Sequence, residues 1–195
     1  MSSHLTTSAM INKLDQLFQK VDVQTRNEIC NRLALERDYW SVEKTDGIRL
    51  LTQSIDSFSV DYPAISALEP EELKLLKEVI VNEVFGLACL DFFLPLNDWS
   101  IIRITNNRTL QFLDVDGHVE ILDFAFRLDR FPTILAERFA VQLEIRMNHL
   151  EPLFERKWNE FIIAVVVPPM AATTAIQITR ISDLMKRWPK TKLPS

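Results

Sequence analysis

The stretch that decides the fold is "WSIIRITNNRTLQFLDVDGHVEILDFAF", residues 99–126. Its apolar side chains recur at every second position, and this alternation breaks at Asn106-Asn107 and again at Asp116-Gly117. The alternation is typical of strands, and such residue pairs favour tight turns between antiparallel strands. The stretch therefore predicts three strands, and pairing across two-residue turns places five side chains on one face: Ile101, Leu110, Phe112, Val119 and Ile121.

Upstream of this stretch the apolar period is that of helices. Apolar residues recur at three- and four-residue spacing, which indicates amphipathic helices with one buried side. The last of these helices begins at Pro70 with Glu71 and Glu72 in its first turn, a strong start signal, and it ends before Pro95. The predicted helices span residues 8–21, 24–39, 46–58 and 70–90.

Downstream of the meander we expect a mixture of both elements. Residues 132–150 have apolar side chains at four-residue steps and predict a helix that Pro152 ends. The run "FIIAVVV" (161–167) predicts a strand buried on both faces, and "TAIQITRI" (174–181) predicts a further strand. The segment "ISDLMKRW" (181–188) predicts a last short helix.

These elements predict an α+β fold, with a helical N-terminal half followed by an antiparallel β-meander packed against helices. A chain of 195 residues is long enough to bury its core as one domain. Within that single domain we expect a helical part at about 8–95, an α/β part at about 97–188 and a basic tail at 189–195.

Composition excludes several classes of function. A net charge of -5 disfavours nucleic-acid binding, and only 3 glycines leave little material for phosphate-binding loops. Cys30 and Cys89 lie far apart in the sequence, and no apolar signal segment opens the chain, so we expect a reducing, cytoplasmic compartment. The most apolar run is 12 residues long (161–172) and contains two prolines, too short for a transmembrane segment.

The run "FLDVDG" (112–117) is the one stretch that resembles a catalytic motif. It is similar to the first motif of the haloacid dehalogenase superfamily, in which an apolar strand ends in Asp-x-Asp-Gly. The resemblance covers these six residues and implies that Asp114 attacks phosphorus while Asp116 acts as acid and base. The family has Thr or Ser where this chain has His118, and it places the motif in a parallel sheet. Its later lysine and paired acidic residues have no match after residue 127.

Two other interpretations of this run compete with the catalytic one. A calcium loop of the EF-hand type places Phe112 where its first carboxylate is required. A tight hairpin turn centred on Asp116 and Gly117 explains the apolar residues on both sides, and we favour it. His118 and His149 have no second ligand four residues further along the chain, so we predict no metal site.

The absence of a site motif favours a non-catalytic protein that binds another protein, without a cofactor: a small acidic cytoplasmic adaptor, chaperone-like factor or assembly subunit. Its size and acidity are similar to those of bacterial secretion chaperones, which hold client segments in apolar grooves or along sheet edges. The alternative is an enzyme, a phosphotransferase or hydrolase, built around Asp114 and Asp116. The predicted partner contacts are a short apolar linker and an apolar, basic C-terminal stripe: Phe92, Phe93, Leu184, Met185, Arg187 and Trp188.

Overall fold

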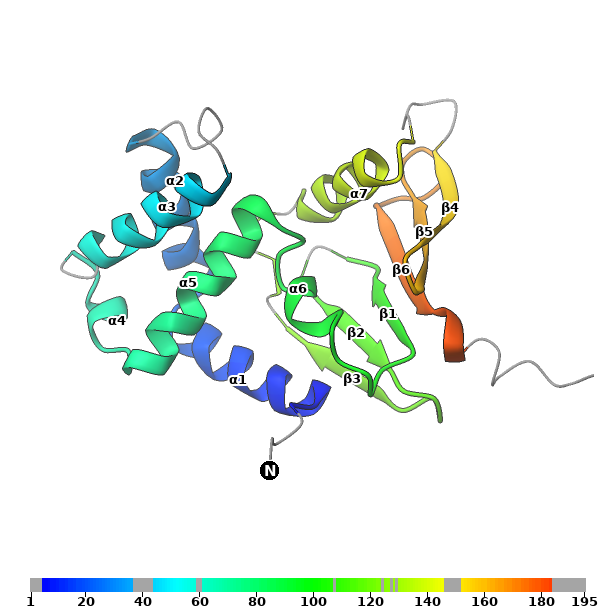
Figure 1. The fold of residues 1–195 in the computed structure, drawn as a ribbon, viewed down its shortest axis with the longest axis horizontal. Helices are drawn as coiled ribbons and strands as arrows, with labels where there is room; N and C mark the ends of the chain where they lie inside the picture. The colour runs from blue at the N-terminus through cyan, green and yellow to red at the C-terminus, as the bar shows by residue number, and fades with distance from the viewer. Residues whose placement is uncertain are drawn as a thin grey trace, which may run out of the picture. The chain divides into compact units, whose positions relative to one another are not determined.

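The structure is a computed structural model that describes residues 5–36, 44–58, 61–106, 108–123, 125–126, 128, 130–145 and 152–183. The fold is α+β, with N-terminal helices followed by a six-stranded antiparallel sheet in the described residues, which confirms the predicted fold class. The chain divides into two compact units (Figure 1). The helical unit comprises Ser8–Pro95 and Phe124–Leu128, and the sheet unit comprises Met1–Thr7, Leu96–Asp123 and Asp129–Ser195.

The helical unit contains the four long helices that the sequence predicts, together with two short ones. The last long helix is shorter than predicted because the chain turns at Gly86. The backbone there lies so close to Asp91 that a Cβ atom on residue 86 would be 2.1 Å from the Asp91 carboxylate. That carboxylate accepts the N–H of Leu87 at 2.6 Å, so the chain leaves the helix there. The helices are α1 (Thr7–Lys20), α2 (Val23–Glu36), α3 (Lys44–Phe58), α4 (Pro63–Ser66), α5 (Pro70–Phe85) and α6 (Leu90–Phe93).

The core of the helical unit encloses one ion pair. The side chains of Arg26 and Glu83 are 0% and 1% exposed, and Arg26 Nη1 lies 3.5 Å from Glu83 Oε1. The Arg26 guanidinium also stacks on the Phe18 ring, 3.9 Å from its centroid. A buried charge is expensive without its partner, so each of these two residues depends on the other.

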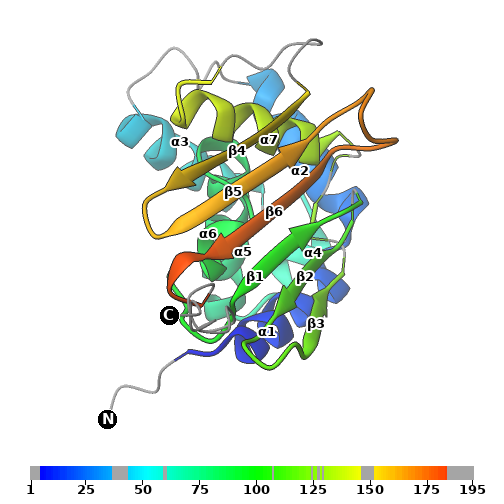
Figure 2. The ribbon, with the colours of Figure 1, turned by 90° about the vertical axis from the view of Figure 1, so that its right-hand side faces the viewer.

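The sheet unit consists of two three-stranded meanders joined side by side. Its strand order is β3-β2-β1-β6-β5-β4, and each neighbouring pair is antiparallel (Figure 2). The predicted strand at 174–181 is confirmed as β6, whereas β4 was not predicted. The elements are β1 (Ile101–Ile104), β2 (Leu110–Leu113), β3 (Val119–Leu122), α7 (Phe131–Gln142), β4 (Leu153–Trp158), β5 (Phe161–Val166) and β6 (Ala175–Arg180).

Helix α7 ends earlier than predicted, whereas the end of the predicted C-terminal helix is not tested. Helix α7 stops at Gln142, and Glu144 has a positive φ of 55° that cannot continue a helix. The C-terminal helix is seen as a single turn at 181–183. The remainder of the predicted C-terminal helix lies outside the described residues.

The register of the first meander differs from the prediction. Backbone pairing matches Ile101 with Leu113, and Leu113 with Val119. These three side chains therefore share one face, while Leu110 and Phe112 point to the other. The predicted common face was wrong for Ile101, Val119 and Ile121.

The physical reason lies in the hairpin loops. Between β2 and β3, the Asp114 N–H donates to the His118 carbonyl at 3.1 Å and the Gly117 N–H donates to the Asp114 carbonyl at 3.3 Å. Gly117 has a φ of 90°, so this is a three-residue loop, a tight turn followed by a left-handed glycine. Between β1 and β2, the Asn106 side chain accepts the N–H groups of Arg108 and Thr109, which also makes a longer connection. One extra loop residue moves alternate side chains to the opposite face.

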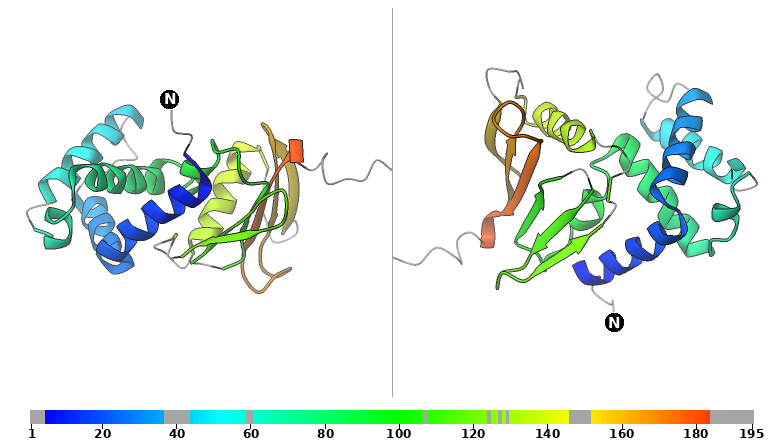
Figure 3. Two further views of the ribbon diagram at one scale, coloured as in Figure 1. Left: turned by 90° about the horizontal axis from the view of Figure 1, so that it is seen from below. Right: turned by 180° about the vertical axis from the view of Figure 1, so that it is seen from behind.

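One face of the sheet, which we call the covered face, packs against α7 (Figures 2 and 3). The Phe139 ring of α7 meets the Trp158 ring edge to face, with centroids 5.6 Å apart. Thr133 of the same helix shares a hydrogen bond with Thr174 at 2.9 Å. Apart from the half-buried Trp158, the aliphatic and aromatic strand residues of this face are buried: Ile102, Ile104, Leu110, Phe112, Leu122, Phe154, Phe161, Ile163, Val165, Ile176 and Ile178.

Arg180 closes the end of the covered face. Its Nε donates to the Trp99 carbonyl at 3.3 Å, its Nη1 donates to Glu160 at 3.1 Å, and its Nη2 donates to the Leu96 carbonyl. The guanidinium also lies 4.5 Å from the Trp99 ring centroid and 5.2 Å from that of Phe161. This buried cation is therefore satisfied by neutral acceptors, aromatic rings and one carboxylate.

Candidate functional site

The opposite face of the sheet, which we call the open face, carries aliphatic side chains without a covering helix in the described part of the sheet unit. Figure 2 looks onto this face, with α7 behind the strands. Val119 is 54% exposed, Ile121 is 47% exposed and Leu153 is 56% exposed. Strand β5 was predicted to be buried on both faces, but Ile162 and Val166 are only half-buried, which corrects that prediction.

Strand pairing arranges the open face in rows that run across the strands. The first row is aliphatic apart from Thr179 and a lysine at its end, and its central members Ile101 and Thr179 are buried, at 8% and 6% exposed. The second row is mainly polar, and in it Arg103 Nε donates to Gln177 Oε1 at 3.0 Å. The rows are Val119, Leu113, Ile101, Thr179, Ile162 and Lys157, then Ile121, Gln111, Arg103, Gln177, Ala164 and Glu155, and at one end Ala175, Val166 and Leu153.

The turn that carries Asp114 and Asp116 is held together by the Asp114 carboxylate. Its Oδ1 accepts the N–H groups of Asp116 and His118, at 2.8 and 2.9 Å. Its Oδ2 lies 2.8 Å from His118 Nδ1. The stretch is therefore a hairpin turn as predicted, but with a three-residue loop in place of the predicted two-residue turn, and Gly117 is the residue that requires a positive φ.

The same contacts shift the protonation of both groups. The hydrogen bond with the His118 side chain, followed by the backbone N–H donors, lowers the pKa of Asp114 below its ordinary value of 3.8. The hydrogen bond and negative charge of Asp114 raise the pKa of His118 above 6.5. The two side chains thus form an ion pair on the surface of the turn over a broad range of acidic pH.

Asp116 completes a small group of possible cation ligands. One ligand atom each from Asp114, Asp116 and His118 lies within 4.8 Å of the others. A cavity of about 240 Å³ adjoins this turn and is lined in part by Asp98, Trp99 and His118. The Asp98 carboxylate in that cavity already accepts the backbone N–H and the hydroxyl of Thr7, at 2.7 and 2.6 Å. The side chains of Asp114, His118 and Asp98 in this arrangement therefore already make hydrogen bonds that stabilise the local structure.

The fold around Asp114 can be compared with the fold that the phosphotransfer resemblance implies. Asp114 follows β2 and is joined by the hairpin turn to the antiparallel strand β3. The resemblance implies instead a parallel sheet with a helix after the motif. The local fold therefore differs from the one that the six-residue resemblance implies.

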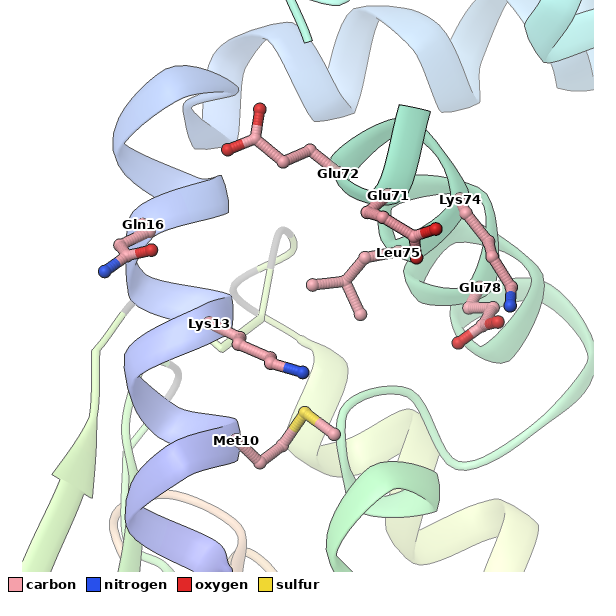
Figure 4. Close-up of a pocket in the computed structure, with 8 residues that line it drawn as sticks. All are labelled: Met10, Lys13, Gln16, Glu71, Glu72, Lys74, Leu75 and Glu78. Carbon is pink, nitrogen blue, oxygen red and sulfur yellow. The ribbon is translucent and has the colours of Figure 1, made fainter. Parts of the chain in front are cut away.

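The helical unit has a surface groove between α1 and α5, with a volume of about 300 Å³ (Figure 4). Met10 and Leu75 form its apolar part. An ion pair between Lys20 and Glu72 joins the two helices beside it. The rest of the lining carries both signs of charge, from Lys13, Glu71, Glu72, Lys74 and Glu78. A partner that covered this groove would remove its charged side chains from water, which costs free energy. The open face is therefore the better candidate for a partner-binding surface.

The structure places the predicted contact residues in different surroundings. Phe93 in α6 is fully buried, whereas Phe92 is half-buried. The buried Phe93 side chain is not accessible to a partner, which leaves Phe92 as the accessible member of the pair. The other predicted contacts, Leu184, Met185, Arg187 and Trp188, lie outside the described residues, as does His149.

The described residues that precede this C-terminal segment are structural. Arg180 is 6% exposed and Asp183 is 4% exposed, and the Ser100 hydroxyl donates to the Asp183 carboxylate at 3.0 Å. A deletion that tests the C-terminal stripe alone must therefore begin at residue 184, because a deletion from residue 180 also removes buried anchors of the sheet unit.

The two cysteines offer no accessible nucleophile. Cys30 and Cys89 are both buried free thiols. The Cys89 thiol donates a hydrogen bond to the Ala125 carbonyl at 3.2 Å. Burial, helped by the charge of Glu83, raises the pKa of the Cys89 thiol to about 12, which keeps it protonated at neutral pH.

Comparison with known proteins does not add a family to this geometry. No family model matches the chain, and no curated protein matches its sequence at a significant level. Among the described residues, no helix has the length and apolar content needed to cross a membrane.

Sequence reasoning missed the open face because it assumed two-residue turns in the meander. A signal was present, however. Glycine as the third residue of a short loop is the pattern of a three-residue hairpin, and Val115-Asp116-Gly117 fits it. That loop length would have placed Val119 and Ile121 opposite the core.

Proposed function

We propose that this protein is a non-catalytic protein-interaction module, an adaptor, chaperone-like factor or assembly subunit, that binds its partner through the open face. The supporting observation is that aliphatic side chains stay exposed at both edges of this face, Val119 and Ile121 on β3 and Leu153 on β4, whereas the aliphatic strand residues of the covered face are buried. Isolated exposed aliphatic residues are common on protein surfaces, but neighbouring ones such as Val119 and Ile121 are more typical of an interaction site or an aggregation hazard.

The size of the open face suits one partner. Six strands at a spacing of about 4.8 Å, with about five residues each, present on the order of 400 Å². A complete interface of about 800 Å² per partner would extend beyond the sheet onto its surroundings.

The proposed compartment is the cytoplasm. Its support is limited to the sequence and to the two free, buried thiols, which fit a reducing environment. The C-terminal stripe of Leu184, Met185, Arg187 and Trp188 remains a proposed second contact. Removal of residues 184–195 tests that contact without touching Arg180 or Asp183.

The experiment is a quantitative affinity purification of the full chain from its native cells. The double variant Val119→Lys, Ile121→Lys should lose the specific partner at unchanged protein level, because two charges replace the exposed aliphatic side chains of β3 on the open face. The matched control is Val141→Lys on α7, where the side chain is 77% exposed and lies away from the open face. Equal partner recovery from all three proteins would refute the proposal.

The enzyme alternative has its own test. If Asp114 were a nucleophile, Asp114→Asn would abolish a magnesium-dependent phosphatase or phosphotransfer activity of the purified protein. Under the binding proposal the protein has no such activity to lose. We favour binding because the Asp114 carboxylate is engaged by two backbone N–H groups and the His118 ring.

A further inference from the structure

We propose that the partner binds by strand addition: an extended segment of the partner, with alternating aliphatic and basic residues, pairs with β3 as a further antiparallel strand. This inference rests on the function proposed above and states how the partner engages the protein. It follows from the backbone groups that β3 presents at the edge of the sheet, from the side chains at the two edges and from the acidic residues around β3.

The backbone of β3 presents hydrogen-bonding groups along the edge of the sheet. In the described sheet β3 has a neighbouring strand on one side only, β2 (Figure 2). Leu113 of β2 lies opposite Val119, and its carbonyl accepts the Ser100 N–H at 2.7 Å, on the side away from β3. Because bonded and non-bonded pairs alternate along an antiparallel ladder, the N–H and C=O groups of Val119 and Ile121 point away from β2, towards the open edge.

The two edges of the sheet differ in the side chains at such outward positions. On the opposite edge strand, β4, the Val167 N–H donates to the Pro152 carbonyl at 2.9 Å, so the outward backbone groups belong to Leu153, Glu155 and Lys157. Two of these three residues are charged, and charged side chains on an edge strand oppose pairing with another strand. The two outward residues of β3 are both aliphatic, so β3 is the edge that accepts a strand.

A strand added to β3 also covers exposed apolar surface. Every second side chain of the added strand lies on the open face, beside Val119 and Ile121, which are exposed there. Aliphatic residues at those positions form cross-strand pairs with both side chains. Strand addition therefore combines backbone hydrogen bonds with burial of the aliphatic residues that the sheet leaves exposed.

The acidic residues around β3 select basic residues at the alternating positions. Glu120 lies opposite Phe112, so its side chain is on the covered-face side of β3. Asp116 precedes the strand and Asp123 follows it, and all three carboxylates belong to exposed residues. Lysine or arginine next to Glu120 complements this edge, whereas an acidic residue there is repelled.

A second copy of the chain fits this edge less well. A two-fold symmetric dimer would pair β3 with β3, which brings the same acidic residues of both copies together, Glu120 and Asp123 among them. Like charges across paired strands oppose association. The partner is therefore another protein with a basic extended segment.

The experiment titrates the full-length protein with a peptide of about seven residues in which valine and lysine alternate, and it follows amide hydrogen exchange by NMR. In the protein alone, the amide protons of Val119 and Ile121 should exchange rapidly. At saturation the peptide should slow their exchange by at least about tenfold, while the amides of Glu155 and Lys157 on the other edge keep their rates. Slow exchange in the protein alone would mean that this edge is already paired, and would overturn the inference.

Methylation of the peptide backbone separates strand addition from attraction between charges. In antiparallel pairing the valine amides of the peptide point towards β3 and the lysine amides point away. Methylation of the valine nitrogens should therefore abolish the protection of Val119 and Ile121, whereas methylation of the lysine nitrogens should preserve it. Equal effects of the two methylated peptides would contradict strand addition.

Two charge variants test the acidic edge. Glu120→Lys should weaken binding of the valine–lysine peptide about two- to fivefold and strengthen binding of a valine–glutamate peptide. The matched control is Glu155→Lys on β4, which should leave both affinities unchanged. Equal effects of the two substitutions would show that the peptide responds to net charge alone, and would overturn the inference.

The remaining outcomes separate this inference from the proposed function. Failure of the valine–lysine peptide to bind, or self-association that Ile121→Lys abolishes, would overturn strand addition by a basic partner segment. Photo-crosslinks from the open face to another protein would still uphold the proposed function in those cases. If the peptide does not bind and open-face crosslinks are also absent, both proposals fail.

Discussion

The two faces of the sheet carry similar aliphatic side chains but meet different surroundings. On β5, Ile163 is 0% exposed beneath α7, whereas its neighbour Ile162 points to the open face and is half-buried. A strand rich in isoleucine and valine therefore does not reveal how many of its faces lie in the core. The open face therefore has exposed and half-buried aliphatic residues of the same kind that the covered face buries.

The largest effect should come from the helix that makes the covered face a core. Phe139→Ala removes a fully buried ring that packs on Trp158, and we expect it to destabilise the protein by about 3–5 kcal/mol. Urea unfolding of the full chain measures this loss. A loss below about 1 kcal/mol would mean that α7 contributes little to the core and that the two faces differ less than we conclude.

Truncation of adjacent residues on β5 compares the faces directly. Ile163→Ala should cost about 2–5 kcal/mol because it leaves a cavity, whereas Ile162→Ala should cost less than about 1 kcal/mol. The two variants share the strand, the residue type and the assay, so each serves as the control of the other. Equal losses would show that both faces are buried in solution.

The turn that sets the register should give a smaller effect. Gly117→Val forces a β-branched residue to a φ of 90°, and we expect a loss of about 1–3 kcal/mol. No heavy atom lies within 4 Å of the position that a Cβ would take, so the loss reports the backbone conformation and not a steric clash. Gly117→Asn, which tolerates positive φ, is the control and should lose less. Unchanged stability in the valine variant would contradict the turn geometry.

The smallest expected effect concerns pH. Because the pKa of Asp114 is lowered and that of His118 is raised, their pairing stabilises the folded state fully between pH 3.8 and pH 6.5, the ordinary values of the two groups. The stabilisation is lost as pH falls through the lowered pKa of Asp114 or rises through the raised pKa of His118. NMR titration should give His118 a pKa above 6.5 that drops in Asp114→Asn. A pKa insensitive to that substitution would contradict the pairing.

Much of the fold was predictable because its signals are local. Helical periodicity and the proline at the start of α5 predicted the long helices, and alternation predicted β1, β2 and β3. Strand β4 was not predicted because the sequence "LFERKW" has charged residues at its centre, as edge strands often have. The end of α5 was predicted too late in the sequence because it depends on the side chain of Asp91, which lies beyond the helix.

The candidate site was harder to predict because it depends on register. The alternation in "HVEILDF" is equally compatible with either face, and one loop residue decides between them. The Asp114 turn was recognised because turn chemistry is local. The extra loop residue was not recognised, and that residue is what places the exposed Val119 and Ile121 on the open face.

The most direct test of the central claim is site-specific photo-crosslinking in native cells. A benzophenone amino acid replaces Ile121 on the open face in one protein and Val141, 77% exposed on α7, in another. We predict a specific adduct with another protein from position 121 and none from position 141. Adducts from position 141 alone, or no adduct from position 121, would contradict the claim that the open face binds a partner.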